Sequence, residues 1–172
     1  MNLDLKKYIR DIPDFPEKGI LFRDITPVLD SPEAFGWICD TLAERYSEYD
    51  IDKIAGIEAR GFLFGSVLAY KLGKGFIPVR KPGKLPGETV SESYSLEYGK
   101  ASLEIQVDAV SEGDSILIVD DLLATGGTAA AAAKLVQNAG GRVIEIFSVI
   151  ELTNLKGRDR LSGIPLYSLI SY

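Results

Sequence analysis

A chain of 172 residues, 46% of them hydrophobic and 26% charged, is long enough for one sizeable core and too short for two full domains. Its formal net charge of −6 argues against a general nucleic-acid-binding protein, and no apolar run approaches the length of a membrane span. The single cysteine, Cys39, excludes an intramolecular disulfide and a cysteine-based zinc site. We therefore predict one domain, residues 1–172, in a cytoplasmic protein without nucleic-acid or membrane partners.

The first periodic segment of the chain is a predicted amphipathic helix over residues 31–49. Ser31 and Pro32 form an N-cap and first-turn pair. Apolar side chains follow at helical spacing and form a stripe that we expect to face the core: Phe35, Ile38, Leu42, Tyr46 and Tyr49. Before this helix, we expect an irregular backbone between Gly19 and Pro27.

Two units of strand, helix and strand follow in the sequence. They cover residues 53–57, 61–73 and 75–79, and then residues 115–120, 128–141 and 142–152. Such units build parallel sheets with right-handed crossovers. The sequence therefore predicts an α/β fold with a mainly parallel central sheet flanked by helices, and the alanine run of the second helix lets that helix lie close to the sheet.

A long segment without regular periodicity separates the two units. Residues 80–93 contain two prolines, two glycines and three basic residues. Residues 93–107 then alternate as a hairpin that turns near Gly99 and Lys100. Because a loop of this length in a compact domain is usually functional or disordered, we expect residues 80–107 to form a flap loop and hairpin.

The stretch VDDLLATGGT, residues 119–128, places two aspartates before a glycine-containing loop that opens a helix. Amides in the first turn of such a helix attract phosphate oxygens, but no Walker sequence and no G-x-G-x-x-G fingerprint is present. A sugar phosphate fits both features, because Asp120 and Asp121 would accept hydrogen bonds from ribose hydroxyls while the loop amides hold the phosphate. Those amides belong to Ala124, Thr125, Gly126, Gly127 and Thr128. The alternative is an acid pair that only caps the helix or faces solvent.

A second anion site is predicted at the turn between residues 57 and 61. Arg60 and the local amides at this helix N-terminus would hold a diphosphate, whereas the alternative is a surface ion pair of Arg60 with Glu58. Lys81 and Lys84 on the long loop would close over the same anion and exclude water. The alternative for these two lysines is ordinary solvated charge.

Three further residues are candidates for contact with a planar ligand. The chain contains no histidine, so proton transfer falls to other groups. Glu97 and Tyr98, on the hairpin after the flap, are the acid/base candidates that a moving flap would carry to a ligand. The alternative for Glu97 is a surface carboxylate on a strand. Phe22 offers an aromatic face for stacking, and its alternative is a core side chain in a loop.

The segment 119–128 resembles the signature with which type I phosphoribosyltransferases bind phosphoribosyl pyrophosphate (PRPP). Four more segments are similar to the adenine phosphoribosyltransferase branch of that family: FPEKGILFRDITPVL, EARGFLFG, RKPGKLPGETVSESYSLEYGKASLEIQ and VIELTNLKGRDRL. The resemblance covers nearly the whole chain. It implies the type I phosphoribosyltransferase fold, with residues 1–30 as a base-binding hood segment, residues 80–107 as a flexible flap, and a strained or cis peptide in the turn at Ala59 and Arg60.

The resemblance also implies an activity, its ligands and residue roles. Enzymes of this branch make AMP and pyrophosphate from adenine and PRPP with Mg²⁺, as cytoplasmic homodimers. Arg60 would meet the pyrophosphate of PRPP and Glu97 would act at the purine, which makes these two the expected catalytic residues. Main-chain groups of Leu21 and Arg23 would read the edge of adenine beside Phe22. Mg²⁺ would be held chiefly by PRPP oxygens and water, with few or no direct protein ligands.

Alternatives from other classes of protein stay open at this point. A regulator that senses PRPP would keep residues 119–128 without needing Arg60 or Glu97, and usually carries a DNA-binding piece. A structural or interaction protein would use the glycines only for turns. Within the enzyme class, the runner-up is a transferase for guanine, hypoxanthine or xanthine, whose base site would have a different hydrogen-bond polarity.

Overall fold

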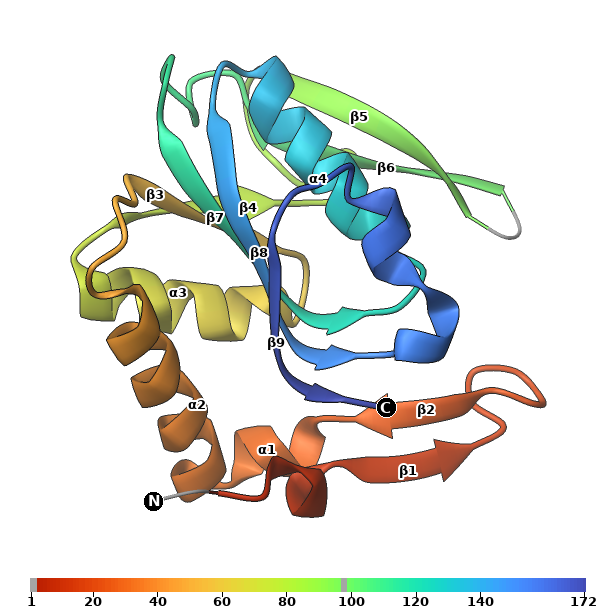
Figure 1. The fold of residues 1–172 in the computed structure, drawn as a ribbon. Helices are drawn as coiled ribbons and strands as arrows, with labels where there is room; N and C mark the ends of the chain where they lie inside the picture. Colours follow the sequence, from red (N-terminus) through yellow and green to blue (C-terminus); the bar gives the residue numbers. More distant parts are fainter. Residues whose placement is uncertain (1–2, 97–98) are drawn as a thin grey trace. The chain divides into compact units, whose positions relative to one another are not determined.

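The computed structural model of the protein describes residues 3–96 and 99–172 (Figure 1). It forms two compact units, Met1–Ser47 and Glu48–Tyr172. The predicted hood segment, residues 1–30, belongs to the first unit. The predicted strand, helix and strand units and the predicted flap all belong to the second.

The N-terminal unit contains a short 3-10 helix, a pair of strands and two helices, of which the last is the longest. Its elements are η1 (Leu5–Tyr8), β1 (Arg10–Pro13), β2 (Leu21–Asp24), α1 (Thr26–Asp30) and α2 (Pro32–Tyr46). Strands β1 and β2 are antiparallel, and Asp11 forms an ion pair with Arg23 directly opposite. The prediction of an irregular backbone between Gly19 and Pro27 is therefore wrong for most of that segment. Four residues are too few to show a strand period, and the pairing partner lies outside the segment.

Helix α2 begins where the sequence predicts it and ends three residues early. The hydroxyl of Ser31 accepts a hydrogen bond of 3.2 Å from an amide of the first turn. Ile38, Leu42 and Tyr46 are each at most 1% exposed, as expected for the core stripe. The helix ends at Tyr46, and Tyr49 is 41% exposed. The helical spacing of apolar residues in the sequence thus continues about one turn beyond the observed end of the helix.

The larger unit is built on a five-stranded sheet in the order β4-β3-β7-β8-β9, in which all neighbours are parallel. Its strands are β3 (Lys53–Ile57), β4 (Gly75–Val79), β7 (Ser115–Leu123), β8 (Arg142–Glu151) and β9 (Leu166–Ser171). Its helices are α3 (Gly61–Leu72), α4 (Gly127–Asn138) and the short η2 (Thr153–Leu155) and η3 (Gly157–Arg160). This arrangement confirms the predicted α/β fold.

The strand order creates a crevice between β3 and β7. Strand β4 lies beyond β3 and strand β8 lies beyond β7, so right-handed crossovers place α3 and α4 on opposite faces of the sheet. Figure 1 shows these two helices on either side of the sheet. The chain therefore turns in opposite directions where it leaves the carboxyl ends of β3 and β7. Ligands of open α/β sheets bind at such a switch point.

The predicted hairpin forms, but its first strand begins earlier than expected. Strand β5 (Thr89–Leu96) pairs antiparallel with β6 (Gly99–Gln106), and Leu96 lies opposite Gly99. Gly99 and Lys100, near which the turn was predicted, both belong to β6. Residues 89–92, expected to be loop, already belong to strand β5. The alternation of apolar and polar residues predicts a hairpin. It does not set the register of the two strands, which depends on which side chains of β6 face the core.

Helix α4 and the central strands supply the core of the larger unit. In β7, every residue from Ile116 to Val119 is fully buried. Four of the five residues in the alanine run are at most 4% exposed, and α4 contacts β7 and β8 on one side and the hairpin strands β5 and β6 on the other. The structural role predicted for the alanines is thus confirmed. Within the described residues, no helix has the length and apolar character needed to cross a membrane.

Candidate active site

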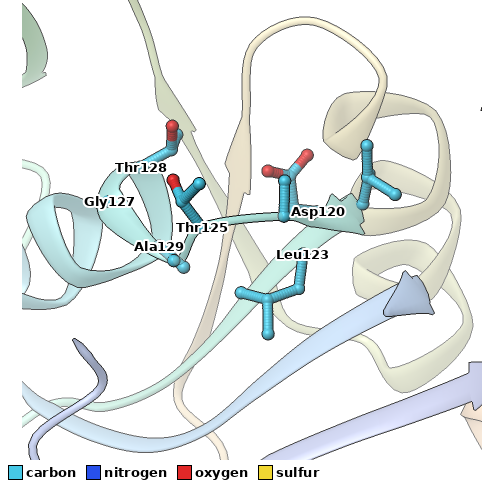
Figure 2. Close-up of a pocket in the computed structure, with 9 residues that line it drawn as sticks. Asp120, Leu123, Thr125, Gly127, Thr128 and Ala129 are labelled. Atoms are coloured by element: carbon cyan, nitrogen blue, oxygen red, sulfur yellow. The ribbon is translucent and has the colours of Figure 1, made fainter. Parts of the chain in front are cut away.

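The segment 124–126 links β7 to α4 and forms a narrow concave loop. Gly126 has a left-handed backbone with φ +80°, a conformation that favours glycine. A cavity of about 80 Å³ lies against this loop and is lined by Asp120, Leu122, Leu123, Ala124, Thr125, Gly126, Gly127, Thr128 and Ala129. Figure 2 shows the hydroxyls of Thr125 and Thr128 and the carboxylate of Asp120 on the same side of the chain, with Leu123 pointing away. The loop and helix terminus thus offer amides and hydroxyls to one small anion.

The two aspartates differ in their surroundings because both lie in strand β7, where successive side chains alternate. Asp120 is half-buried, and its Oδ1 accepts a hydrogen bond of 2.9 Å from the amide of Asp121. Asp121 is only 4% exposed, and its Oδ2 lies 2.8 Å from Nε of Arg60, an ion pair without hydrogen-bond alignment. Burial, and then the Asp121 carboxylate, raise the pKa of Asp120 well above its ordinary value. Burial also raises the pKa of Asp121, and the charge of Arg60 opposes that effect.

The turn after β3 is held by a second ion pair. Glu58, the alternative partner that the sequence suggests for Arg60, instead accepts hydrogen bonds from Arg80, with Oε1 3.0 Å from Nη2. It also accepts one of 3.0 Å from the amide of Lys81. The hydrogen bond from Arg80 has the largest effect in lowering the pKa of Glu58, and the hydrogen bond from the amide of Lys81 adds to it. The peptide bond between Glu58 and Ala59 is cis, in agreement with the peptide geometry expected for this turn.

A second cavity joins the turn after β3 to the loop after β7. Its volume is about 330 Å³, and its lining includes six of the residues predicted for the site: Arg60, Lys81, Asp120, Asp121, Ala124 and Thr128. The ion pair of Arg60 with Asp121 links the two segments directly. Lys84 is exposed and is not among the described residues that line this cavity, although its carbonyl accepts a hydrogen bond of 3.0 Å from Arg80.

The hairpin contributes a residue that the sequence did not single out. Tyr94 on β5 lines the 330 Å³ cavity, and its hydroxyl accepts a hydrogen bond of 3.2 Å from the hydroxyl of Thr128. This contact connects the hairpin to the first turn of α4. Alternation along β5 shows which face Tyr94 occupies, but it gives no sign that Thr128 lies opposite that face.

The remaining predicted residues lie in the N-terminal unit or outside the described part of the chain. Leu21, Phe22 and Arg23 are consecutive on β2. Leu21 is 46% exposed, and the rings of Phe22 and Phe15 meet edge to face with centroids 5.0 Å apart. Because ladder geometry alternates along an antiparallel strand, the main-chain groups of Leu21 and Arg23 point to the same strand edge. Glu97 and Tyr98 fall outside the described residues.

Comparison with known proteins agrees with the geometry of this site. The family described as "Phosphoribosyl transferase domain" matches residues 28–163 of the chain. An adenine phosphoribosyltransferase from Thermosipho melanesiensis is 58% identical over 170 residues, which cover 99% of this chain and 97% of the relative. The crystal structure of adenine phosphoribosyltransferase from Thermoanaerobacter pseudethanolicus has a TM-score of 0.95 at 57% identity, with 98% of both chains covered. The Saccharomyces cerevisiae enzyme, solved with an imino-altritol bisphosphate and adenine, has a TM-score of 0.91 at 46% identity, with 97% of both chains covered.

The parallel sheet, the two loops at its switch point and the match over residues 28–163 together define a phosphoribosyltransferase. The chain belongs to the phosphoribosyltransferase family and, within it, to the adenine phosphoribosyltransferases. The resemblance identified from the sequence and the fold that it implied are both confirmed.

Proposed function

We propose that the protein transfers the 5-phosphoribosyl group of PRPP to N9 of adenine, giving AMP and pyrophosphate. The observation that carries this proposal is the 330 Å³ cavity at the switch point, which is lined by cations from the segments after β3 and β4 and by acids and the helix N-terminus after β7. A ligand with an anion at each end and hydroxyls between them matches that order of groups. PRPP has this arrangement.

The phosphate loop and the acid pair would hold the ribose 5-phosphate part of PRPP. The amides from Ala124 to Thr128 and the hydroxyls of the two threonines are the donors for the 5-phosphate. Asp120 and Asp121 accept hydrogen bonds from the ribose hydroxyls. Positive charge develops on the ribose ring as the bond to pyrophosphate breaks, and nearby carboxylates favour it. That charge also favours the ionised form of two acids whose pKa values burial has raised.

Arg60 and Lys81 would bind the leaving pyrophosphate. Both residues line the cavity, and the ion pair with Asp121 holds Arg60 next to the ribose site. Lys84 lies on the same loop as Lys81, and we assign it to closure of that loop over the anion. We therefore propose that the 5-phosphate binds at the N-terminus of α4 and the pyrophosphate at the turn after β3.

The residues also fit a Mg²⁺ ion that enters with PRPP. Within the described residues there is no cluster of three or more metal-ligating side chains, but the buried Oδ2 of Asp121 has no aligned hydrogen-bond donor, and Asp121 is among the residues that line the cavity. A hard ion that keeps its waters needs only one or two carboxylates besides the diphosphate oxygens. When bound, Mg²⁺ neutralises the charge of the leaving pyrophosphate.

The residues that contact the base are proposed from the resemblance to the family. Main-chain groups of Leu21 and Arg23 would read the Watson–Crick edge of adenine, with Phe22 beside the ring. Glu97 would exchange a proton with the purine, and Tyr98 would contact the substrate beside it. We further propose that the enzyme acts as a cytoplasmic homodimer.

A base-specificity assay tests this function. Pyrophosphate release from PRPP and Mg²⁺ is measured with adenine, hypoxanthine, guanine, xanthine and uracil in turn. We expect turnover with adenine and a kcat/KM about 10⁴-fold lower with hypoxanthine, because the reversed donor and acceptor leave buried groups unpaired. Excess chelator should abolish turnover. Equal rates with adenine and hypoxanthine would point to the broader purine transferase.

A thermal-shift titration with PRPP and Mg²⁺ separates the enzyme from the non-catalytic alternatives. A protein whose glycines only make turns would show no shift. A regulator that senses PRPP would show a shift but release no pyrophosphate with any base.

A further inference from the structure

The short helix η3 approaches the phosphate loop so closely that no side chain fits between them. A Cβ atom added to Gly126 would lie 2.2 Å from the carbonyl oxygen of Gly157, and one added to Gly157 would lie 2.4 Å from the carbonyl oxygen of Ala124. Real Cβ atoms essentially never come nearer than 3.0 Å to a neighbour. The position of η3 therefore limits the positions that the loop backbone can adopt.

An ion pair fixes η3 in this place. Arg158, adjacent to Gly157, donates from Nε to Oε1 of Glu151 at 2.6 Å and from Nη2 to Oε2 at 2.7 Å. The same carboxylate accepts a hydrogen bond of 2.8 Å from the hydroxyl of Ser168, and Nη1 of Arg158 donates to the carbonyl of Leu166 at 3.1 Å. The guanidinium thus ties η3 to two strands, β8 and β9.

Burial and charge make Glu151 the fixed end of this pair. Its side chain is 7% exposed, whereas that of Arg158 is 50% exposed. The hydrogen bonds from Arg158 lower the pKa of Glu151 below its ordinary value, so the carboxylate is ionised at neutral pH. A bidentate pair of this kind defines an orientation as well as an attraction. Lysine in place of Arg158 would keep the positive charge but could not make the two parallel hydrogen bonds to the carboxylate.

We propose that Arg158 is a positioning residue for PRPP, which acts through Gly157 to hold the amides of the phosphate loop in the arrangement that binds the 5-phosphate. The inference rests on the proposed function. Arg158 is not among the described residues that line either cavity of the site, so it acts only through the loop. Because several amides must converge on one anion, a shift of the loop by about 1 Å weakens binding strongly. Adenine, which does not use this loop, is unaffected.

The test compares Arg158→Met and Arg158→Lys with a control, Arg160→Met. Arg160 lies on the same short helix, and it lines a different cavity together with residues of α4 and of the hairpin. KM values for PRPP and adenine, kcat, and the melting temperature are measured for each variant. The dissociation constant of ribose 5-phosphate is measured by calorimetry without adenine.

In Arg158→Met we expect the KM for PRPP and the dissociation constant of ribose 5-phosphate to rise about tenfold or more, which is within the range for a misplaced binding group. The KM for adenine should change less than about twofold. Arg158→Lys should fall between Met and wild type, and Arg160→Met should match wild type.

A purely structural role would lower the melting temperature of Arg158→Met and leave both KM values and ribose 5-phosphate binding unchanged, and that result would overturn the proposal. If Arg158→Met does not fold, Arg158→Lys decides by the same criteria. A wild-type protein that makes no AMP would contradict the proposed function instead. In that case, ribose 5-phosphate binding by wild type and variants still decides whether Arg158 positions the loop.

Discussion

Replacing Gly126 with alanine should damage PRPP binding more than it damages the fold. Two separate costs arise at this residue. Its φ of +80° lies in the left-handed region, where an L side chain costs about 1–2 kcal/mol. In addition, the new Cβ would lie 2.2 Å from the carbonyl oxygen of Gly157, and that gap would have to open to at least 3.0 Å.

The second cost determines the effect on binding. Both partners in the contact are backbone, so neither can rotate away, and the phosphate loop or η3 must shift by most of an ångström. A displacement of about 1 Å in a positioned binding group costs up to roughly 10²-fold. We therefore expect the KM for PRPP to rise between about 10- and 100-fold in Gly126→Ala. The KM for adenine should change little.

A matched control separates backbone strain from the steric clash. Gly73, the C-cap of α3, also has a left-handed φ of +65°, but a Cβ there would meet nothing within 4 Å. Gly73→Ala should lower the melting temperature by a few degrees, since about 1 kcal/mol corresponds to roughly 2–4 °C in a protein of this size. Its KM for PRPP should equal that of wild type.

Steady-state kinetics with PRPP as the varied substrate, at saturating adenine and Mg²⁺, measure these effects for both variants. If Gly126→Ala binds PRPP within about twofold of wild type, the loop does not hold the 5-phosphate, because a tenfold loss needs only about 1.4 kcal/mol. If Gly73→Ala shows the same loss as Gly126→Ala, general destabilisation explains both.

Four further predictions concern other parts of the site. Arg60→Ala should weaken product inhibition by pyrophosphate more than inhibition by AMP, because Arg60 is assigned to the leaving half of PRPP; equal losses in the two inhibition constants would contradict this. Thr125→Ala should raise the KM for PRPP about tenfold, the usual scale for one hydrogen bond to a charged group, and an unchanged KM would exclude its hydroxyl as a donor. Glu97→Gln should keep PRPP binding and lose about 10²-fold in single-turnover AMP formation, whereas a rate within about threefold of wild type would make Glu97 only a lid contact. Glu151→Gln should be less stable than wild type at neutral pH; because the folded-state pKa of Glu151 is lowered, this difference is fully present above the ordinary value of 4.5 and disappears as pH falls through the folded pKa. Urea unfolding between pH 3 and 7 measures it, and a difference that does not change with pH would show that the charge of Glu151 is not what stabilises the protein.

Much of the site could be predicted from local sequence alone. The stretch 119–128 joins an apolar strand, two acids and adjacent glycines, and each feature depends only on neighbours along the chain. Period and capping likewise placed β3 and β4 correctly and marked the end of α3 at Gly73. Turn and strand ends in the hairpin were less well predicted, because register depends on which face of β6 is buried.

The tertiary structure alone decided how these segments meet. Nothing in the sequence shows that β3 lies beside β7, and this order brings Arg60 to Asp121. The pair of Arg80 with Glu58 depends instead on the pairing of β3 with β4. The hydrogen bond between Tyr94 and Thr128 follows from the packing of the hairpin on α4.

Gly157 shows most clearly the difference between what local sequence determines and what the tertiary structure determines. Its segment was recognised as part of a family pattern, but the requirement for glycine arises from a carbonyl group more than thirty residues earlier in the chain, at Ala124. Local sequence determines the conformations that a segment prefers, through periodicity, capping and turn chemistry. Contacts between distant segments depend on strand order and packing, which only the folded chain as a whole specifies.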